Sequence, residues 1–510
     1  GGDNVAVGGL SFVANTTGSS NTALGYNSLA ANTTASNNTA LGTSALAANT
    51  TGTSNVAVGS GALAANTTAD HNTAVGVNAL DTNTTGEHNT AVGKNALDAN
   101  TTATANTALG SSTLPANTTG ASNTAVGHSA LEANTTASNN TAVGKNALVA
   151  NTTGPSNTAI GMNTMAANTT GNTNTAVGNS ALAANTVGDN NTALGNDALA
   201  SFNPSSNADT YNTAVGSQAG TAVTTGIQNT FVGGLAGDAT DDGSYNVAVG
   251  LQALSANCGD RNTAVGESAL SLTTAGNNTG IGNGAGKAIT TGANNTFVGA
   301  ETGDATDDGS NNTAVGQSAL SANCADANTA IGNSAAIACT GADNTVVGYY
   351  AGGQLTSGSR NLILGHESGS NLFSNGLFQV TTHNDRIVLG TTEATNAYIQ
   401  IDWTVVSDER DKTEIQDVSQ GLDFVKQLRP ISYKFKTNRD DATPKGNTKY
   451  GFSAQDVLAL EGSSPVIVDN EESDKLKLTS AHIIPVLTKA IQEQQALIEA
   501  LTARITTLEG

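Results

Sequence analysis

Positive charge is nearly missing from the first 406 residues of this 510-residue chain. Only six of the 19 lysines and arginines precede Ser407, and they stand against 24 acidic residues, for a net charge of −18. Because binding to a phosphate backbone requires a basic face, this composition excludes nucleic acid as a partner. The other thirteen basic residues all follow Ser407, so the chain consists of two segments that differ in composition.

Long apolar runs and cysteines are also scarce. No stretch of about 18 apolar residues occurs, so we expect no membrane insertion. Three cysteines are too few for a disulfide scaffold, although one bridge between Cys324 and Cys339 stays open, while Cys258 has no such neighbour. The chain lacks an initiator methionine and begins inside a repeat unit, so we expect a segment upstream.

What the chain has instead is internal repetition. The pentamer NTAVG, with variants such as NTALG, begins twelve times at a strict 17-residue step from Asn4 to Asn191. After the insertion SFNPSSNADTY the step is 16 or 17 residues, and a block that begins at Asn229 returns 66 residues later at Asn295. Such short units, with a β-prone pentamer and Gly, Asn and Thr at the corners, predict the coils of a parallel β-solenoid.

The pentamer also predicts what each face of its strand does. The second and fourth positions share one face, and the third, mostly alanine, lies on the other. Both faces are apolar or small, which is typical of a strand buried on two sides. We therefore expect one face to fill the coil and the other to meet a neighbouring chain. The leading asparagines should form an amide ladder, and 22 pentamers, the last at Asn361, predict a length of roughly 105 Å.

Four segments follow from these patterns. Residues 1–200 form the regular repeat, residues 201–390 carry the 66-residue super-repeat, and residues 391–406 are a connecting strand. Residues 407–510 have an α+β pattern. It comprises a helix that ends before Pro430, a strand at ISYKFK, a turn and short helix at KYGFSAQDVLALEG, a hairpin, and a long helix after Ser480.

The last helix carries apolar residues at steps of three and four, which is the pattern of a coiled-coil seam. The seam comprises Ile484, Leu487, Ile491, Gln494, Ile498, Leu501, Ile505 and Leu508. Gln494 would set the register, and the alternation of Ile and Leu by itself favours two strands. An amphipathic helix packed on its own domain is the alternative.

Two families resemble parts of this chain. Over about residues 1–390, the NTAVG units resemble the left-handed β-roll repeats of trimeric autotransporter adhesin heads, whose repeat is shorter, and the shafts of phage tail fibres. Over residues 407–510, the order SDERDK, GLDFVKQLRPISYKF, YGFSAQDV and AIQEQQALI resembles the intramolecular chaperone auto-processing domain of phage tail spikes and fibres. Together they imply a parallel homotrimer whose C-terminal domain assembles three chains and then cuts itself off.

The second resemblance implies a reaction centre at Ser407 and Lys412, with cleavage of the Val406–Ser407 bond. A serine hydroxyl needs a base, and a lysine can act as one only where desolvation or positive charge lowers its pKa. Apolar neighbours could supply a dry wall: Val405, Val406 and Trp403. Charged neighbours act in both directions: Arg410 against Asp408, Glu409 and Asp411. The alternative is a polar hinge in which Ser407 caps a helix.

Other polar motifs are weaker signals. Two DATDDG segments begin like a calcium loop but lack its twelfth-position glutamate, so acidic turns are the stronger interpretation and we expect no other cofactor. The calcium candidates are Asp238, Thr240, Asp242, Asp304, Thr306 and Asp308. The single histidines His71, His88 and His128 lack the spacing of a metal site, and the NTT sequons are explained as corner residues.

These observations favour a homotrimeric phage tail fibre or spike with a single-turnover, self-cleaving serine peptidase domain. Its partners would be a host-cell-surface glycan or protein receptor and other tail proteins, and it would lie in the extracellular virion tail after assembly in the host cytoplasm. Aromatic residues suggest that residues 349–405 contact the receptor: Tyr349, Tyr350, Phe373, Phe378, Tyr398 and Trp403.

Three alternatives stay open: a polysaccharide-depolymerising tail spike, a bacterial surface adhesin and an ice-binding solenoid. A glycosidase needs two facing carboxylates, whereas the acidic residues of the first 200 positions are scattered one per coil, so we expect no enzyme activity in the repeat.

Overall fold

The computed structural model describes residues 2–370, 379–391, 394, 400, 405–436, 442–471 and 473–510. The chain divides into two compact units. The first, called the solenoid below, comprises Gly1–Ser368 and Val380–Leu389. The second, called the C-terminal unit, comprises Gly369–Gln379 and Gly390–Gly510. Most of the expected connecting strand, residues 391–406, lies outside the described residues, as do Phe373, Phe378, Tyr398 and Trp403.

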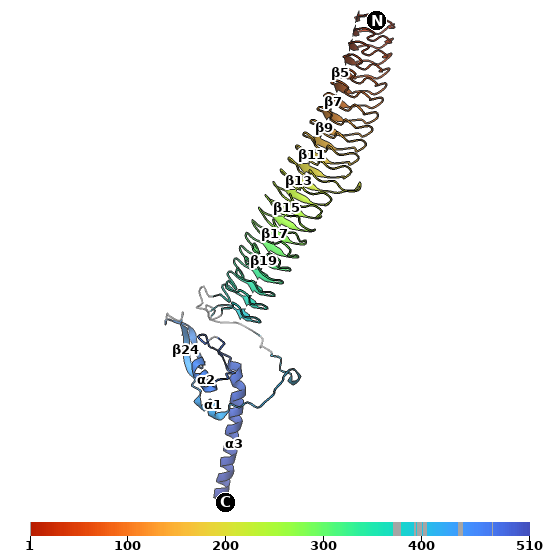
Figure 1. Ribbon diagram of the computed structural model, residues 1–510. Coiled ribbons are helices and arrows are strands. Elements are labelled where there is room, and N and C mark those ends of the chain that lie inside the picture. Colours follow the sequence, from red (N-terminus) through yellow and green to blue (C-terminus); the bar gives the residue numbers. More distant parts are fainter. Residues whose placement is uncertain are drawn as a thin grey trace. The chain divides into compact units, whose positions relative to one another are not determined.

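The solenoid is a stack of coils, each of which adds one three-residue strand to a single parallel sheet (Figure 1). The strands are β1 Val5–Val7, β2 Thr22–Leu24, β3 Thr39–Leu41, β4 Val56–Val58, β5 Thr73–Val75, β6 Thr90–Val92, β7 Thr107–Leu109, β8 Thr124–Val126, β9 Thr141–Val143, β10 Thr158–Ile160, β11 Thr175–Val177, β12 Thr192–Leu194, β13 Thr213–Val215, β14 Thr230–Val232, β15 Val247–Val249, β16 Thr263–Val265, β17 Thr279–Ile281, β18 Thr296–Val298, β19 Thr313–Val315, β20 Thr329–Ile331, β21 Thr345–Val347, β22 Leu362–Leu364 and β23 Ile387–Leu389.

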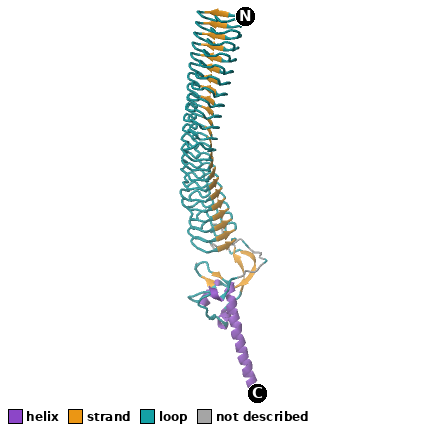
Figure 2. Cartoon of the chain, turned by 90° about the vertical axis from the view of Figure 1, so that its right-hand side faces the viewer, coloured by secondary structure: helices purple, strands orange, loops and turns teal. Residues whose placement is uncertain are grey.

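Every strand pairs in register with the strand of the next coil, as Ala91 does with Ala108. In Figure 2 the strands stack as one orange stripe along the column of loops. The predicted fold class, a mostly β parallel solenoid, is therefore confirmed. The last predicted pentamer began at Asn361, but β23 pairs with β22 and adds one further strand, with Arg386 in the asparagine position.

The interior of each coil is filled from two places in the repeat. The alanine at the third pentamer position is fully buried, as at Ala74, and so is the leucine of the ALAAN segment, as at Leu80. These side chains stack on their equivalents in the next coil and form one continuous apolar core. Each coil buries its apolar side chains against the coils on either side of it. This burial requires the strict period of the sequence, because the period places equivalent side chains next to one another.

Two ladders of buried asparagines hold the coils together. In the predicted ladder, the backbone N–H of Asn123 donates to Oδ1 of Asn106 at 2.9 Å, and Nδ2 of Asn106 donates to the Gly120 carbonyl at 2.9 Å. The second ladder uses the NTT asparagines: Nδ2 of Asn134 donates to Oδ1 of Asn117 at 2.9 Å. Asn134 is completely buried, so its sequon is closed to glycosylation in the folded coil.

The outward face of the sheet is exposed in the single chain. Pentamer positions two and four point out, with exposures of 43% at Leu24, 48% at Leu109 and 46% at Leu194. The inward face fills the coil as predicted, and the contact of the outward face with a neighbouring chain stays a prediction. Positions just outside this apolar stripe are variable and mostly polar, with apolar exceptions at Val77, Met162 and Leu251, so the sheet presents an apolar seam with largely polar edges.

After residue 201 the second asparagine ladder gives way to other buried side chains. Phe202 takes the place of the next asparagine, and Cys258, Cys324 and Cys339 lie in later coils. All three cysteines are free thiols, so the bridge left open between Cys324 and Cys339 is not formed. Burial raises the pKa of the Cys339 thiol to about 12, which keeps the thiol protonated.

The C-terminal unit packs three helices and two hairpins around a small core. Its elements are η1 Glu409–Asp411, α1 Leu422–Gln427, β24 Ile431–Lys436, β25 Pro444–Gly451, α2 Ala454–Glu461, β26 Val468–Asp469, β27 Lys477–Leu478, η2 Ser480–His482 and α3 Ile483–Glu509. The predicted helices, first strand and second hairpin are all present. Strand β25, which pairs antiparallel with β24, was missed because PKGNTKYG looks like a turn.

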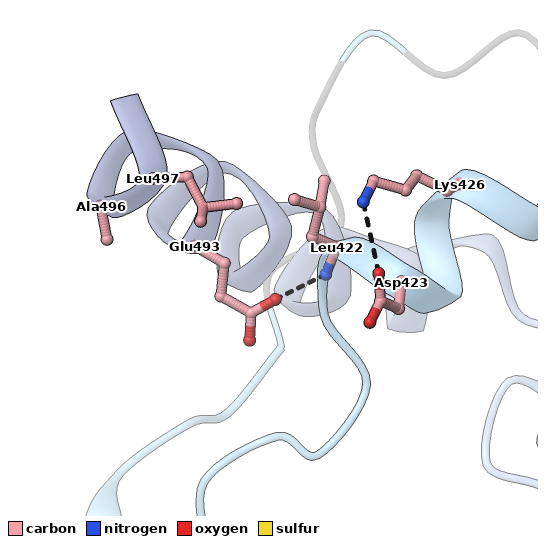
Figure 3. A pocket seen from close by; sticks show the side chains of 6 residues that line it. All are labelled: Leu422, Asp423, Lys426, Glu493, Ala496 and Leu497. Atoms are coloured by element: carbon pink, nitrogen blue, oxygen red, sulfur yellow. Dashed lines mark hydrogen bonds and ion pairs between the residues drawn. The ribbon is translucent and has the colours of Figure 1, made fainter. Parts of the chain in front are cut away.

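Helix α1 is joined to α3 through a carboxylate. Gly421 precedes α1 and offers no side-chain cap, and Oε2 of Glu493 on α3 accepts the Leu422 N–H at 2.7 Å instead (Figure 3). A hollow of about 420 Å³ lies here, lined by Leu422, Asp423, Lys426, Glu493, Ala496 and Leu497. A side chain at Gly421 would collide with the Glu493 carboxylate. Glycine at this position therefore allows the hydrogen bond between Glu493 and the Leu422 N–H.

Helix α3 has two apolar faces. Ile483, Val486 and Ala490 are buried against the rest of the unit. The predicted seam lies on the other side, with exposures of 63% at Ile484 and 65% at Ile491, and the same face continues exposed to Leu508. The alternative that the seam packs on its own domain is therefore wrong. No described helix is long and apolar enough to cross a bilayer.

Candidate active site

The two predicted catalytic residues flank the short helix η1. Asp408 caps this helix, because its carboxylate accepts the backbone N–H of Arg410 at 2.9 Å. Lys412 ends the helix in an extended conformation, and its N–H donates to the Glu409 carbonyl. One tight turn therefore separates positions 407 and 412. The alternative in which Ser407 caps a helix is wrong, since the capping residue is Asp408.

This turn brings the two side chains into contact. Nζ of Lys412 lies 2.7 Å from Oγ of Ser407, and it also donates to the Ser407 carbonyl at 3.1 Å. With an ammonium group the lysine donates in the first contact. With a neutral amine the same geometry lets the hydroxyl donate to nitrogen, which is the arrangement that activates a serine.

Two of the charged neighbours of this contact, Asp408 and Arg410, pair with each other. Arg410 forms a paired contact with Asp408, and this hydrogen bond holds the pKa of Asp408 below its usual range and raises that of Arg410. Arg410 was expected to act as a like charge on Lys412. Because its guanidinium is engaged by Asp408, it contributes less than the sequence suggested.

The described residues of the single chain do not form the water-excluding apolar surroundings that were expected around Ser407 and Lys412. Ser407 and Lys412 are both exposed, and Val405 and Val406 are 80% and 82% exposed. Trp403 lies outside the described residues. The valines therefore do not desolvate the lysine within one chain.

Comparison with known families identifies this same segment. Residues 407–463 match the family model of the chaperone of endosialidase, Peptidase_S74. The match begins at the serine of the contact and ends after α2, and the core then continues from α2 into the second hairpin and α3. Comparison with curated proteins finds no relative of the chain.

The family match indicates a function for residues 407–463 that the contact between Ser407 and Lys412 does not establish by itself. The family is a self-cleaving chaperone domain, so the match supports autoproteolytic activity in this segment. Together with the long solenoid it fits a tail fibre or spike with a C-terminal chaperone. The match covers residues 407–463 and leaves the solenoid outside it. What is known of the solenoid is therefore its fold.

The structure does not bring the calcium candidates together. Thr240 is fully buried, with its hydroxyl 3.4 Å from Sγ of Cys258, while Asp242 is exposed. Thr306 likewise contacts Cys324 at 3.2 Å. Among the described residues, no group of three or more His, Cys, Asp and Glu could hold a metal ion.

Two pairs of side chains lie closer than expected from the sequence. His71 and His88 were interpreted as isolated, but their rings stack with centroids 5.1 Å apart. Asp81 and Asp98 face each other closely enough that burial, and then the charge of Asp81, raise the pKa of Asp98. Both pairs are 17 residues apart, so the repeat period was the signal that could have found them.

Proposed function

We propose that this protein is a homotrimeric phage tail fibre or spike that attaches to the host surface, and that its C-terminal unit aligns three chains and then releases itself at the Val406–Ser407 bond. The contact between Ser407 and Lys412, at the first residue of the family match, carries this proposal. The assembled fibre would lie in the virion tail, joined to other tail proteins.

Two exposed apolar surfaces support the trimer. The solenoid leaves an apolar seam along its sheet, at residues such as Leu24 and Ile331, and α3 leaves its heptad seam uncovered. Contiguous apolar surfaces of this length mark sites of association. The heptad pattern alone favours two strands, so three chains rest on the resemblance to trimeric fibres.

The cleavage chemistry follows from the contact. Lys412, as the neutral amine, takes the Ser407 proton while Oγ attacks the Val406 carbonyl carbon. The C–N bond then breaks, the nitrogen of Ser407 takes a proton, and the Val406 acyl group is held as an ester on Oγ. Water hydrolyses the ester, leaving a carboxylate at Val406 and a free amine at Ser407. Because the valines are exposed in the single chain, we propose that neighbouring chains complete the dry surroundings on assembly.

Mass spectrometry of the expressed protein tests the cleavage. We expect one fragment ending at Val406 and another beginning at Ser407. Ser407→Ala removes the nucleophile and Lys412→Ala removes the base, so both variants should stay whole while keeping the molar mass of a trimer by light scattering. Hydroxylamine added during the reaction should convert the ester into a hydroxamate at Val406.

Ser419→Ala and Lys426→Ala are matched controls, because both side chains are exposed in the same unit and neither contacts Ser407. They should cleave like the natural protein. Equal cleavage of the Ser407→Ala variant would refute the proposal, and so would an uncut natural protein in its assembled form.

A polysaccharide-depolymerising spike is the second candidate, and Asp81 and Asp98, which lie at equivalent places on neighbouring coils, are its candidate carboxylates. Most glycosidases use two carboxyl groups, one as the general acid and the other as the base or nucleophile. Release of reducing ends from capsular polysaccharide, lost in Asp98→Asn, would favour this candidate over a purely binding fibre.

A further inference from the structure

Tyr349 and His366 occupy the same place on successive coils, directly after the glycine of the pentamer. Their rings stack with centroids 5.1 Å apart and planes inclined by 20°. The ring of Tyr350 lies beside them, 6.4 Å from that of Tyr349 and tilted by 41°. His366 covers one face of the Tyr349 ring, but Tyr349 is 52% exposed, so this group, called the aromatic platform below, is partly open to solvent.

The platform is held in place by its surroundings. Nε2 of His366 lies 3.8 Å from Oε1 of Glu367, whose side chain is only 11% exposed. The backbone N–H of Glu367 donates to the Tyr349 carbonyl at 2.8 Å. The Tyr350 ring lies over Gly353, where a Cβ would come within 2.2 Å of the ring. A surface ordered in this way loses little entropy when a ligand binds.

A row of polar groups leads up to the platform. Positions equivalent to Tyr349 on the two preceding coils hold Gln317 and Asn333, and Nδ2 of Asn333 donates to Oε1 of Gln317 at 3.3 Å. Since successive coils are spaced at about 4.8 Å, these two coils offer two planar amides about that distance apart. Amides both donate and accept hydrogen bonds, as the hydroxyl groups of sugars do.

Parts of this column carry charges that favour contact with water when chains associate. Further along the solenoid it carries Lys94, Lys145 and Glu267, all of them exposed. Burying such charges in an apolar contact between chains would be costly. The column also holds the apolar residues Val77, Met162 and Leu251 on other coils. Its members Gln317, Asn333, Tyr349 and His366 are all exposed in the single chain and are open to an external ligand.

We propose that the aromatic platform and the amide row form a subsite for a polysaccharide that lies along the coils. The apolar face of one sugar ring would stack on Tyr349, and the hydroxyl groups of the following units would bond to Asn333 and Gln317. A chain of repeating polar units matches amide groups that lie on two successive coils. The inference rests on the proposed function, because it makes a glycan the surface component that the fibre recognises.

Binding of purified polysaccharides to the full-length protein tests this inference. The probes are dextran, mannan, galactan and O-antigen polysaccharides purified from a panel of bacteria, measured by calorimetry. We expect at least one to bind, and Tyr349→Ala to weaken its binding about tenfold. Tyr349→Phe should stay within about threefold of the natural protein, because the ring face is retained.

Tyr26→Ala is the matched control. Tyr26 occupies the same column and is 56% exposed, but its neighbours in the column are Gly9 and Thr43, so no ring stacks on it. Its replacement should leave binding unchanged. Equal binding by Tyr349→Ala, equal loss in Tyr26→Ala, or a changed molar mass of Tyr349→Ala by light scattering would each overturn the subsite.

Adsorption to the same bacteria separates this inference from the proposed function. If the protein adsorbs to cells but binds none of the purified polysaccharides, the subsite is refuted and the attachment function stands. If it binds polysaccharide through Tyr349 but adsorbs to no cell, the subsite stands and the attachment function is refuted.

Discussion

Glycine at the end of each pentamer is set by the distance between coils. At Gly233 the backbone has φ +139°, and a Cβ would lie 2.5 Å from the carbonyl oxygen of Gly250 in the next coil. The next residue, Gly234, has ordinary backbone angles, and a Cβ there would lie 3.6 Å from Cδ1 of Leu251. Two adjacent glycines thus have opposite tolerance for a methyl group.

We predict that Gly233→Ala destabilises the solenoid and that Gly234→Ala does not. Backbone strain alone at such an angle costs about 1–3 kcal/mol, and the contact with Gly250 adds to it. Denaturant titration measures the difference, and hydrogen exchange should place the loss near β14 and β15. Equal stability of the two variants would show that the coils can separate without cost.

At the scale of elements, α3 serves two partners at once. Its first turns pack on the C-terminal unit through Ile483 and Val486, and the opposite seam continues along the helix. Pro485 is tolerated because it lies in the first turn, where its missing N–H has no intrahelical partner. The helix is therefore anchored at one end and free to associate along its length.

We predict that Leu501→Glu prevents association of the chains and that Ala503→Glu does not. Both positions are exposed on α3, but Leu501 belongs to the seam and Ala503 lies outside it. A charge buried in a coiled-coil core is strongly unfavourable. Light scattering should give a lower molar mass for Leu501→Glu alone, and an unchanged mass would contradict the role of the seam.

At the scale of the whole molecule, the charge is strongly acidic, with a net of −22. Burial raises the pKa of five solenoid aspartates above the ordinary value of 3.8: Asp81, Asp98, Asp189, Asp238 and Asp304. For such groups ionisation opposes folding. The pKa of Asp385 is lowered by its hydrogen bond to Arg360, so it acts in the opposite direction, below 3.8.

We predict that the solenoid becomes more stable as the pH falls from about 7.5 to about 5.2. The cost of ionised, partly buried aspartates is fully present at neutral pH and is lost as the pH falls through their raised pKa values towards 3.8. Denaturation midpoints at the two pH values measure the effect, above the pI of ≈ 4.4. Asp98→Asn should be more stable at pH 7.5 and less sensitive to pH. A fall in stability over this range would contradict the prediction.

The sequence alone determined the parts of this protein that depend on neighbours along the chain. A strict 17-residue period implies coils that close only on each other, so the solenoid, its alanine face and the first asparagine ladder were predictable. Ser407 and Lys412 are five residues apart across one tight turn, so their contact needed no distant residue. The helix α3 and its seam follow from local periodicity.

Tertiary structure decided the rest, because it depends on which surfaces meet. The NTT asparagines turn inward to form the second ladder, Glu493 reaches α1 from 71 residues away, and β25 forms because β24 lies beside it. Exposure is also a tertiary property: Val405 and Val406 were expected to dry the active site, yet both face solvent in the single chain. Burial follows from three-dimensional packing, which residue type at one position does not specify.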